Sequence, residues 1–344
     1  MNKLKEYISF VPGFAAALAI AWIAKFAEGL LPIHMISASV IALFIGMILN
    51  GIQKPGKVFA PGIKFTSKKM LKFAIILLGA SLNITTIMHV GSVSLIVMVF
   101  TLLTCFGGGY FVGRALGLNW KLSNLISAGT GICGGSAIAA ISPVIDAEDT
   151  DIAYAMSATF IFDMVMIVLF PIMGHAMGLS DAAYGLWSGT AVNDTSSVVA
   201  AGYAFSEAAG DFAVMVKLTR TLAIIPTVIV FTLINIRLKR KAMTAGDTNV
   251  SLNVKSVFPY FILGFLALSM INSLGLIPAA ASALMKEISK FLMIAALAAI
   301  GLNTSFSEMR KSGHAPMVHG FIISALVVIV ALLAIWLEQM LGLL

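Results

Sequence analysis

The chain has 344 residues, of which 60% are hydrophobic and only 11% are charged, and its formal net charge is +7 at pH 7. Its mean hydropathy of +1.01 is far above that of a soluble domain, so the composition excludes a soluble enzyme or binding module and predicts an integral membrane protein. No stretch is long and polar enough for a separate soluble domain, so residues 1–344 are expected to form a single transmembrane domain.

Apolar runs long enough to cross a bilayer recur along the whole chain. We expect spans at residues 9–30, 33–50, 70–88, 92–113, 152–177, 212–236, 256–275, 285–306 and 317–342. Two segments rich in Gly, Ser and Thr, at 122–145 and 182–204, bring the expected total to about eleven. Continuous apolar runs are typical of helices, whereas barrel strands alternate, so the predicted fold class is an all-α polytopic membrane protein.

Basic residues cluster in a few of the predicted loops. Lys3 and Lys5 precede the first span, and the later clusters are Lys54, Lys57, Lys64, Lys68, Lys69 and Lys72, then Arg237, Lys239, Arg240 and Lys241, and then Arg310 and Lys311. If all of them face the cytoplasm, the positive-inside rule is satisfied with the N-terminus inside and the C-terminus outside. Topology accounts for the positive charge, so we expect the lipid bilayer as a partner and no nucleic acid.

The two Gly, Ser and Thr-rich segments are copies of one motif. Residues 127–140 read SAGTGICGGSAIAA and residues 187–200 read WSGTAVNDTSSVVA, and they align without a gap. Glycine-rich backbone at membrane depth is tolerated only where it is buried in protein or lines a wet cavity. A pair of such breaks in corresponding positions is typical of the binding site of a transporter.

A single predicted span separates the two copies. They would be parallel if both crossed the bilayer and inverted if both were re-entrant hairpins, and either arrangement leaves every basic loop on one side. We favour the re-entrant arrangement, in which the two breaks face each other near the midplane. A second repeat also indicates inverted repeats, because LLGASLNIT at 77–85 resembles AAIGLNTS at 298–305 and the two spans run in opposite directions.

In the first copy, glycines let the backbone leave the helix and approach a ligand, and hydroxyl groups lie between them. These residues are Gly129, Thr130, Gly131, Gly134, Gly135 and Ser136. A half-helix beginning near Gly135 would point free N–H groups into the break, which favours an anion. The alternative is that the glycines only permit close helix packing. Cys133, within the motif, is expected to act as a small hydrophobic residue.

The second copy replaces glycine with polar side chains. Asn193, Asp194, Thr195, Ser196 and Ser197 form a continuous polar run inside an apolar segment. Such a run is costly in lipid and indicates a functional site. Asp194 is expected to cap the half-helix that begins at Ser196, to bind a coupling proton or cation, or to do both.

Charged residues also occur within the predicted spans. Lys217 and Arg220 are three apart and therefore lie on one helix face. Lys217 could snorkel to the interface, whereas the fork of Arg220 suits an oxyanion. Asp163 is expected to be an internal counterion or a proton-relay carboxylate. The histidines fall near predicted loop ends and are expected at the interfaces: His34, His89, His175, His314 and His319.

The segments GTGICGGSAIAA, WSGTAVNDTSSVVAA and KLTR resemble the bacterial sulfate exporter family of YeiH-like inner-membrane proteins. The likeness covers nearly the whole chain. It implies a multi-pass protein of the bacterial inner (plasma) membrane, built from broken helices in inverted repeats and related to cation antiporters and bile-acid-type symporters. The matching positions are Thr130 to Ser136, Thr190, Asp194 to Ser196, Lys217 and Arg220.

These features predict a secondary active transporter that exports a small sulfur oxyanion, sulfate-like or sulfite-like, coupled to a proton or cation. The predicted substrate-binding residues are Thr130, Gly131, Cys133, Gly134, Gly135, Ser136, Thr190, Asn193, Asp194, Thr195, Ser196, Lys217 and Arg220. The coupling-ion candidates are Asp163 and Asp194.

The alternatives are a sodium or proton antiporter, a passive channel and an intramembrane enzyme. No Walker A, GxSxG or HExxH motif is present, so we expect no ATPase activity and no enzyme, with no catalytic residue, metal or cofactor. The expected partner is a small inorganic or organic anion, and the sequence leaves a homodimer open.

Overall fold

The structure is a computed structural model, and it describes residues 2–30, 38–242, 260–304 and 314–342. Every regular element within these ranges is a helix. Among the described residues, five stretches are long and apolar enough to cross a membrane: Ser9–Leu30, Ile84–Ala115, Thr150–Ala176, Glu207–Leu238 and His314–Met340. The predicted all-α polytopic class is therefore confirmed.

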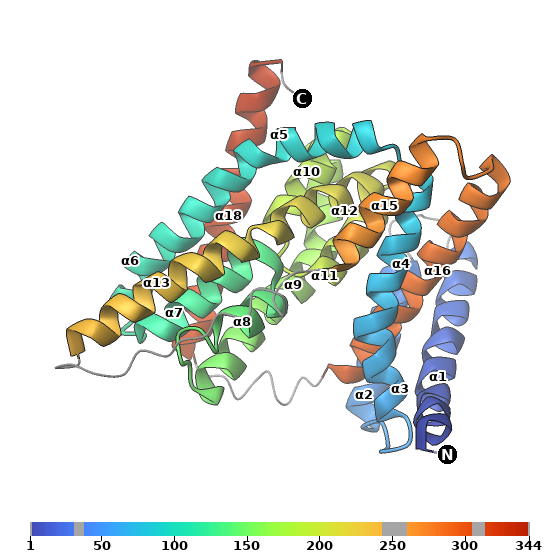
Figure 1. The fold of residues 1–344 in the computed structure, drawn as a ribbon, viewed down its shortest axis with the longest axis horizontal. Helices are drawn as coiled ribbons and strands as arrows, with labels where there is room; N and C mark the ends of the chain where they lie inside the picture. The colour runs from blue at the N-terminus through green and yellow to red at the C-terminus, as the bar shows by residue number, and fades with distance from the viewer. Residues whose placement is uncertain (1, 31–37, 243–259, 305–313, 343–344) are drawn as a thin grey trace.

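The helices form two lobes that stand side by side (Figure 1). The α16 lobe, on the right of that view, contains α1 (Asn2–Leu30), α2 (Ala38–Ile52), α3 (Ala60–Phe65), α4 (Leu71–Leu78), α15 (Tyr260–Ser273) and α16 (Ala279–Asn303). The hairpin lobe, on the left, contains α5 (Ile84–Leu103), α6 (Gly109–Ala115), α7 (Trp120–Ala128), α8 (Gly135–Ile141), α9 (Asp149–Ala176), α10 (Asp181–Ala191), α11 (Thr195–Phe205), α12 (Glu207–Leu222), α13 (Ile224–Ala242) and α18 (His314–Met340). The start of α5 contacts α15, and α5 then runs across the top of the view into the hairpin lobe.

Close glycine contacts hold the α16 lobe together. Helices α2 and α16 cross at Gly46 and Gly301, where a Cβ on Gly301 would lie 2.1 Å from the carbonyl oxygen of Leu43. Helices α1 and α3 meet in the same way at Gly13 and Gly62, where a Cβ on Gly62 would lie 2.2 Å from the backbone of α1. In lipid, such close approach of backbones is what drives helices together. The α16 lobe is therefore a tightly packed frame.

Two of the expected spans have different boundaries in the structure. The expected division between 70–88 and 92–113 was wrong, because the third span runs from Ala60 to Ser81 and α5 already begins at Ile84. The cause is the side chain of Asn83, which accepts a hydrogen bond of 2.9 Å from the backbone N–H of Thr85 and caps α5. An apolar run does not reveal where such a cap falls.

The span expected at 212–236 lies within one continuous stretch, Glu207–Leu238, which has a one-residue break at Ala223. Helix α12 ends at Leu222 and α13 begins at Ile224, with Pro226 in the first turn of α13. Proline has no N–H to donate, so the interruption falls just before it. The break separates the charged part of this span from its apolar part.

The two copies of the second repeat, around Leu82 and Leu302, make corresponding polar contacts. Ser269 on α15 donates a hydrogen bond of 3.0 Å to the carbonyl oxygen of Leu82, and Asn50 on α2 donates one of 2.5 Å to that of Leu302. Each contact satisfies a carbonyl group at a helix end, which has no partner within its own helix. Similar sequences at Leu82 and Leu302 therefore occupy similar surroundings in the α16 lobe.

Candidate functional site

The second copy of the motif folds back on itself as a helical hairpin. Helix α10 leads to an extended tip at Val192–Asp194, and α11 returns from it. The hydroxyl of Tyr184 donates to the carbonyl of Ala201 at 2.9 Å, which shows that the two helices are antiparallel neighbours. At the base, Ser206 donates a hydrogen bond of 2.5 Å to Asp181. Both ends of the segment therefore lie on the same side, as in the re-entrant arrangement.

The first copy has the same form. Helix α7 continues through a π-helical turn, Gly129–Cys133, to a sharp bend at Gly134, and α8 begins at Gly135 as predicted. Gly134 has a φ of 61°, a conformation that a residue with a side chain rarely adopts. At the base, Lys121 donates to the carbonyl of Asp146 at 2.6 Å. This segment is therefore also a hairpin.

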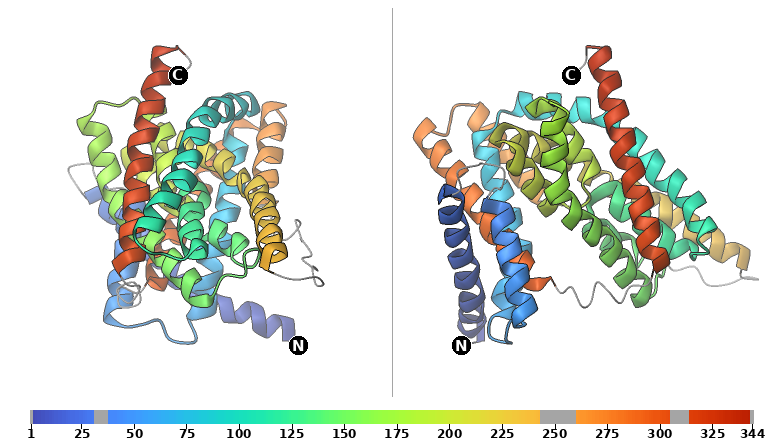
Figure 2. Two further views of the ribbon diagram at one scale, coloured as in Figure 1. Left: turned by 90° about the vertical axis from the view of Figure 1, so that its left-hand side faces the viewer. Right: turned by 180° about the vertical axis from the view of Figure 1, so that it is seen from behind.

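The two hairpins enter from opposite ends, and their tips meet. Figure 1 shows α7 and α8 in the lower part of the hairpin lobe and α10 near its top, and Figure 2 shows the same arrangement from two other sides. A Cβ on Gly134 would lie 3.0 Å from Cβ of Asp194, so the bend of one tip touches the other. The close contact explains why glycine stands at this position.

Two buried cations join the tips. Lys217 is 0% exposed and Arg220 is 1% exposed, and both project from α12. The Lys217 ammonium donates to the carbonyls of Ile132 at 2.9 Å and Val192 at 3.0 Å, and it also donates to the carbonyl of Asn193. All three of its N–H groups are therefore satisfied by backbone, and the snorkelling alternative for Lys217 is wrong.

Arg220 makes a similar set of bonds. It donates to the carbonyls of Thr130 at 2.6 Å, Gly131 at 2.7 Å and Val192 at 3.3 Å. These carbonyls lie at the C-terminal ends of the first halves of the two hairpins, where unpaired carbonyls carry partial negative charge. The two cations thus neutralise two helix ends at once, and they bind both hairpins to α12.

Asp163 on α9 holds the opposite side of the second tip. Its carboxylate accepts hydrogen bonds from the backbone N–H groups of Asn193 at 2.9 Å and Asp194 at 2.8 Å. The peptide groups at the second tip are therefore held by Asp163 through their N–H groups and by Lys217 through their carbonyls. The structure connects Asp163 to Lys217 through these peptide groups, and the two roles expected of Asp163, internal counterion and proton-relay carboxylate, stay predictions.

Asp194 caps the helix that follows it. Its carboxylate accepts from the backbone N–H of Ser196 at 2.9 Å and also from the Ser196 hydroxyl. This confirms the predicted cap at the start of α11. The side chain of Asp194 is only partly buried, and it lies against Gly134 of the other tip.

Three polar atoms at the junction have no partner. Within the described residues, three buried side-chain oxygens take part in no hydrogen bond: Thr130 Oγ1, Asn193 Oδ1 and Ser197 Oγ. A buried polar atom without a partner is costly, and native proteins keep few of them. These atoms are therefore suited to contact a solute or water that enters between the tips.

The structure brings most of the predicted site residues to this junction, but not all. Thr190 donates at 2.6 Å to the carbonyl of Leu186 in its own helix, and Ser136 is exposed. Gly135 and Thr195 are half-buried, next to the tips, and Cys133 is buried within the first tip. In the described ranges, no three His, Cys, Asp or Glu side chains come together as metal ligands.

Sequence reasoning misplaced one histidine. His319 was expected at an interface, but it is 0% exposed, and its Nε2 lies 3.1 Å from the carbonyl of Gly109 and 3.3 Å from the hydroxyl of Ser123. Gly109 and Gly113 are spaced one helical turn apart and leave room for these polar side chains. That spacing in the sequence was the one signal that could have revealed the contact. His34 lies outside the described residues.

The chain matches the family model described as "Conserved hypothetical protein 698" over residues 12–320. It belongs to this family. Similar proteins include the UPF0324 membrane protein of Clostridium tetani, which is 57% identical over 327 residues, covering 93% of this chain and 94% of the relative. A UPF0324 membrane protein of Streptococcus pneumoniae is 39% identical over 318 residues (90% and 92% covered), and SpyM3_0740 of Streptococcus pyogenes is 38% identical over 346 residues (97% and 100% covered). The chain is thus a multi-pass membrane protein of the UPF0324 family.

Proposed function

We propose that the protein is a secondary active transporter that exports a small sulfur oxyanion, such as sulfate or sulfite, coupled to a proton or cation. The observation that carries the proposal is the pair of fully buried cations, Lys217 and Arg220, where two re-entrant tips meet. Buried cations within a span are functional sites by default, and broken segments at the midplane are typical of transporters. The family resemblance of the motifs supports the same substrate class.

The free donors at the junction suit an oxyanion. A guanidinium has five N–H groups, and the three bonds that Arg220 makes to backbone carbonyls leave two for a ligand. The hydroxyls of Thr130 and Ser197, which have no partner in the described structure, can each donate one more hydrogen bond. A doubly charged oxyanion accepts from all of these groups, and the two cations balance its charge.

Asp163 is the proposed coupling site. Its two oxygens each accept one N–H group of the second tip. A proton bound to this carboxylate would turn one acceptor oxygen into a donor and would release one of those N–H groups. Protonation of Asp163 would therefore loosen the tip that Lys217 and Arg220 hold from the other side. Asp194, which caps α11, is the second proposed carrier.

One observation favours a sodium or proton antiporter as the second candidate. Lys217 donates all three of its N–H groups to backbone carbonyls, so its hydrogen bonding is complete without an anion. In that case Lys217 and Arg220 hold the tips together, and Asp163 and Asp194 bind the transported cation. The two candidates differ in whether any flux needs an oxyanion.

We further propose that the N-terminus is cytoplasmic and that the C-terminus is outside the inner membrane. In Figure 1, α1 begins at the bottom and α18 ends at the top, on opposite ends of the molecule. The basic residues between α2 and α4 lie at the lower end with the start of α1, as the positive-inside rule favours.

Flux into proteoliposomes tests the function. Purified protein is reconstituted, and uptake of labelled sulfate and sulfite is measured beside the fluxes of sodium and protons with and without the anion. We expect anion-dependent flux that Arg220→Gln abolishes, whereas Arg114→Gln, at an exposed position at the end of α6, leaves it unchanged. Sodium or proton exchange in the absence of any oxyanion would replace the exporter with the antiporter.

A further inference from the structure

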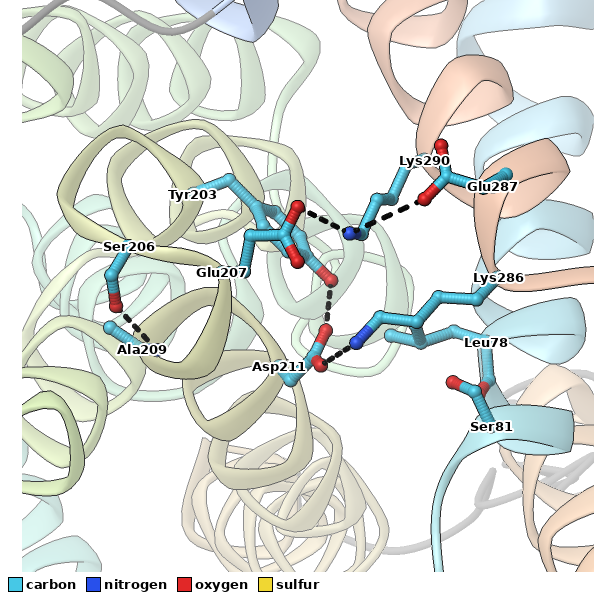
Figure 3. A network of polar contacts seen from close by, with 10 residues as sticks. All are labelled: Leu78, Ser81, Tyr203, Ser206, Glu207, Ala209, Asp211, Lys286, Glu287 and Lys290. Atoms are coloured by element: carbon cyan, nitrogen blue, oxygen red, sulfur yellow. Dashed lines mark hydrogen bonds and ion pairs between the residues drawn. The ribbon is translucent and has the colours of Figure 1, made fainter. Parts of the chain in front are cut away.

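The two lobes are joined by a network of charged side chains, which Figure 3 shows from close by. Lys286 on α16 lies 2.7 Å from the carboxylate of Asp211 on α12, and Lys290 lies 2.7 Å from that of Glu207. The hydroxyl of Tyr203 on α11 donates at 2.6 Å to the second oxygen of Asp211. Both lysines come from the α16 lobe, and the carboxylates nearest to them come from the hairpin lobe. Lys290 also lies 3.8 Å from Glu287 of its own helix.

The spacing of the four charges matches across the interface. Glu207 and Asp211 are one helical turn apart, and so are Lys286 and Lys290. The inner pair is well shielded, with 29% of the Lys286 side chain and 13% of the Asp211 side chain exposed. In the outer pair Lys290 is 17% exposed and Glu207 is 73% exposed. The arrangement forms two rungs, an inner one that is partly buried and an outer one whose carboxylate is exposed.

The remaining contact between the lobes is mainly apolar. One buried cluster includes Leu43 and Met47 of α2 together with Val198 and Ala201 of α11. Apolar contact is non-directional and fixes no particular register between two surfaces. An ion pair with its N and O atoms 2.7 Å apart is also a charge-assisted hydrogen bond, which demands a defined geometry. The two rungs therefore select one relative position of the lobes.

The same helix connects these rungs to the junction of the tips. Asp211 precedes Lys217 by six residues on α12, about 9 Å along the helix axis. Lys217 and Arg220 in turn hold both tips through their backbone carbonyls. A shift of α12 against α16 would therefore carry both tips with it.

We propose that the Lys286–Asp211 and Lys290–Glu207 pairs form a latch that holds the hairpin lobe against the α16 lobe in one state of the transport cycle. Release of the latch lets the hairpin lobe move as a unit and admits solvent to the tips. The inference rests on the proposed transport function, because alternating access requires one lobe to move against the other.

Cys133 is a natural probe of this movement. It lies in the first tip and is 1% exposed, and Cys105 is the other cysteine of the chain. In a Cys105→Ala background, the rate at which N-ethylmaleimide labels Cys133 reports solvent access to the tips in proteoliposomes. We expect Lys286→Met and Glu207→Gln each to raise this rate, the former about tenfold or more and the latter less, because its carboxylate is largely exposed.

Two further variants control the experiment. Lys25→Met breaks an exposed ion pair within the α16 lobe, in which Lys25 lies 3.9 Å from Glu287. Glu287 also lies 3.8 Å from Lys290, but both pairs between the lobes stay intact, so the labelling rate should be unchanged. The exchange Lys286→Asp with Asp211→Lys should restore slow labelling, because it rebuilds the inner pair with the charges reversed. Glu207→Gln tests the outer rung even if a change at the buried Asp211 prevents folding.

Labelling rates in Lys286→Met and Glu207→Gln that equal that of Lys25→Met would overturn the latch. Fast labelling that the charge exchange does not slow would also overturn it, because the loss of the pair would then not be the cause. Labelling needs no transported solute, so the two proposals fail separately. A latch that responds in a protein without any flux would refute only the transport function, and flux with unresponsive labelling would refute only the latch.

Discussion

Replacing Lys217 by methionine tests the central contact of the site. The change keeps most of the apolar length of the side chain but removes three charge-assisted hydrogen bonds to the carbonyls of Ile132, Val192 and Asn193. Val192 still receives a bond from Arg220, so two carbonyls remain buried without this donor. Leaving a buried carbonyl without a donor costs about 1–3 kcal/mol, so the two carbonyls together cost about 2–6 kcal/mol. At about 2 °C per kcal/mol for a large domain, the thermal midpoint should fall by roughly 4–12 °C.

The matched control is Lys121→Met. Lys121 also donates to a backbone carbonyl, that of Asp146 at 2.6 Å, but this bond is exposed. An exposed contact of this kind contributes about 0.5 kcal/mol or less, so the midpoint should shift by about 1 °C. Thermal unfolding of the purified variants in one detergent measures both. If Lys217→Met unfolds within about 2 °C of Lys121→Met, the argument that Lys217 joins the two tips is refuted.

Three more substitutions test other parts of the junction. Asp163→Asn places an amide N–H₂ group where one carboxylate oxygen accepts an N–H group of the second tip. It should therefore lower the thermal midpoint and abolish any proton dependence of flux. Flux that keeps its proton dependence would move the coupling site to Asp194. Gly134→Ala puts a side chain at a φ of 61° and 3.0 Å from the other tip, and it should lower the free energy of unfolding by about 1–3 kcal/mol. The control Gly135→Ala meets only the flexible end of a methionine and should cost less. Equal thermal midpoints for the two variants would contradict the close contact between the tips. Tyr184→Phe removes the hydroxyl that joins α10 to α11 and should cost about 1 kcal/mol in unfolding free energy, and an unchanged midpoint would show that this bond does not hold the hairpin.

The sequence predicted the junction because its signals are local. The duplicated motif contains both tips, and the glycine at position 134 and the cap at Asp194 fall where a helix is interrupted. The breaks are visible in a single sequence because glycine and short polar residues are rare within apolar spans. Their meeting followed from symmetry between the copies.

The features that could not be predicted from the sequence depend on contacts between segments that are distant in the chain. Lys217 lies near a predicted span end, and nothing nearby in the sequence shows that carbonyls 85 and 25 residues away surround it. The nearest partners of Lys286 and Lys290 lie on a helix from the other lobe, so the sequence shows the two lysines only as charges in an apolar segment. Hydropathy and spacing describe one helix at a time, whereas these contacts depend on how helices pack.

The position along the chain of the carbonyls that bind Lys217 and Arg220 has a consequence for the insertion of the protein into the membrane. Every carbonyl that Lys217 and Arg220 bind belongs to residues 130–132 or 192–193, which the ribosome completes before it reaches α12. A lone lysine or arginine at the centre of a helix costs about 2.5–3.5 kcal/mol to insert from the translocon. Both hairpins are already synthesised when α12 emerges, so their carbonyls can accept its charges at once. Biosynthesis from the N-terminus thus supplies the partners before the charges that need them.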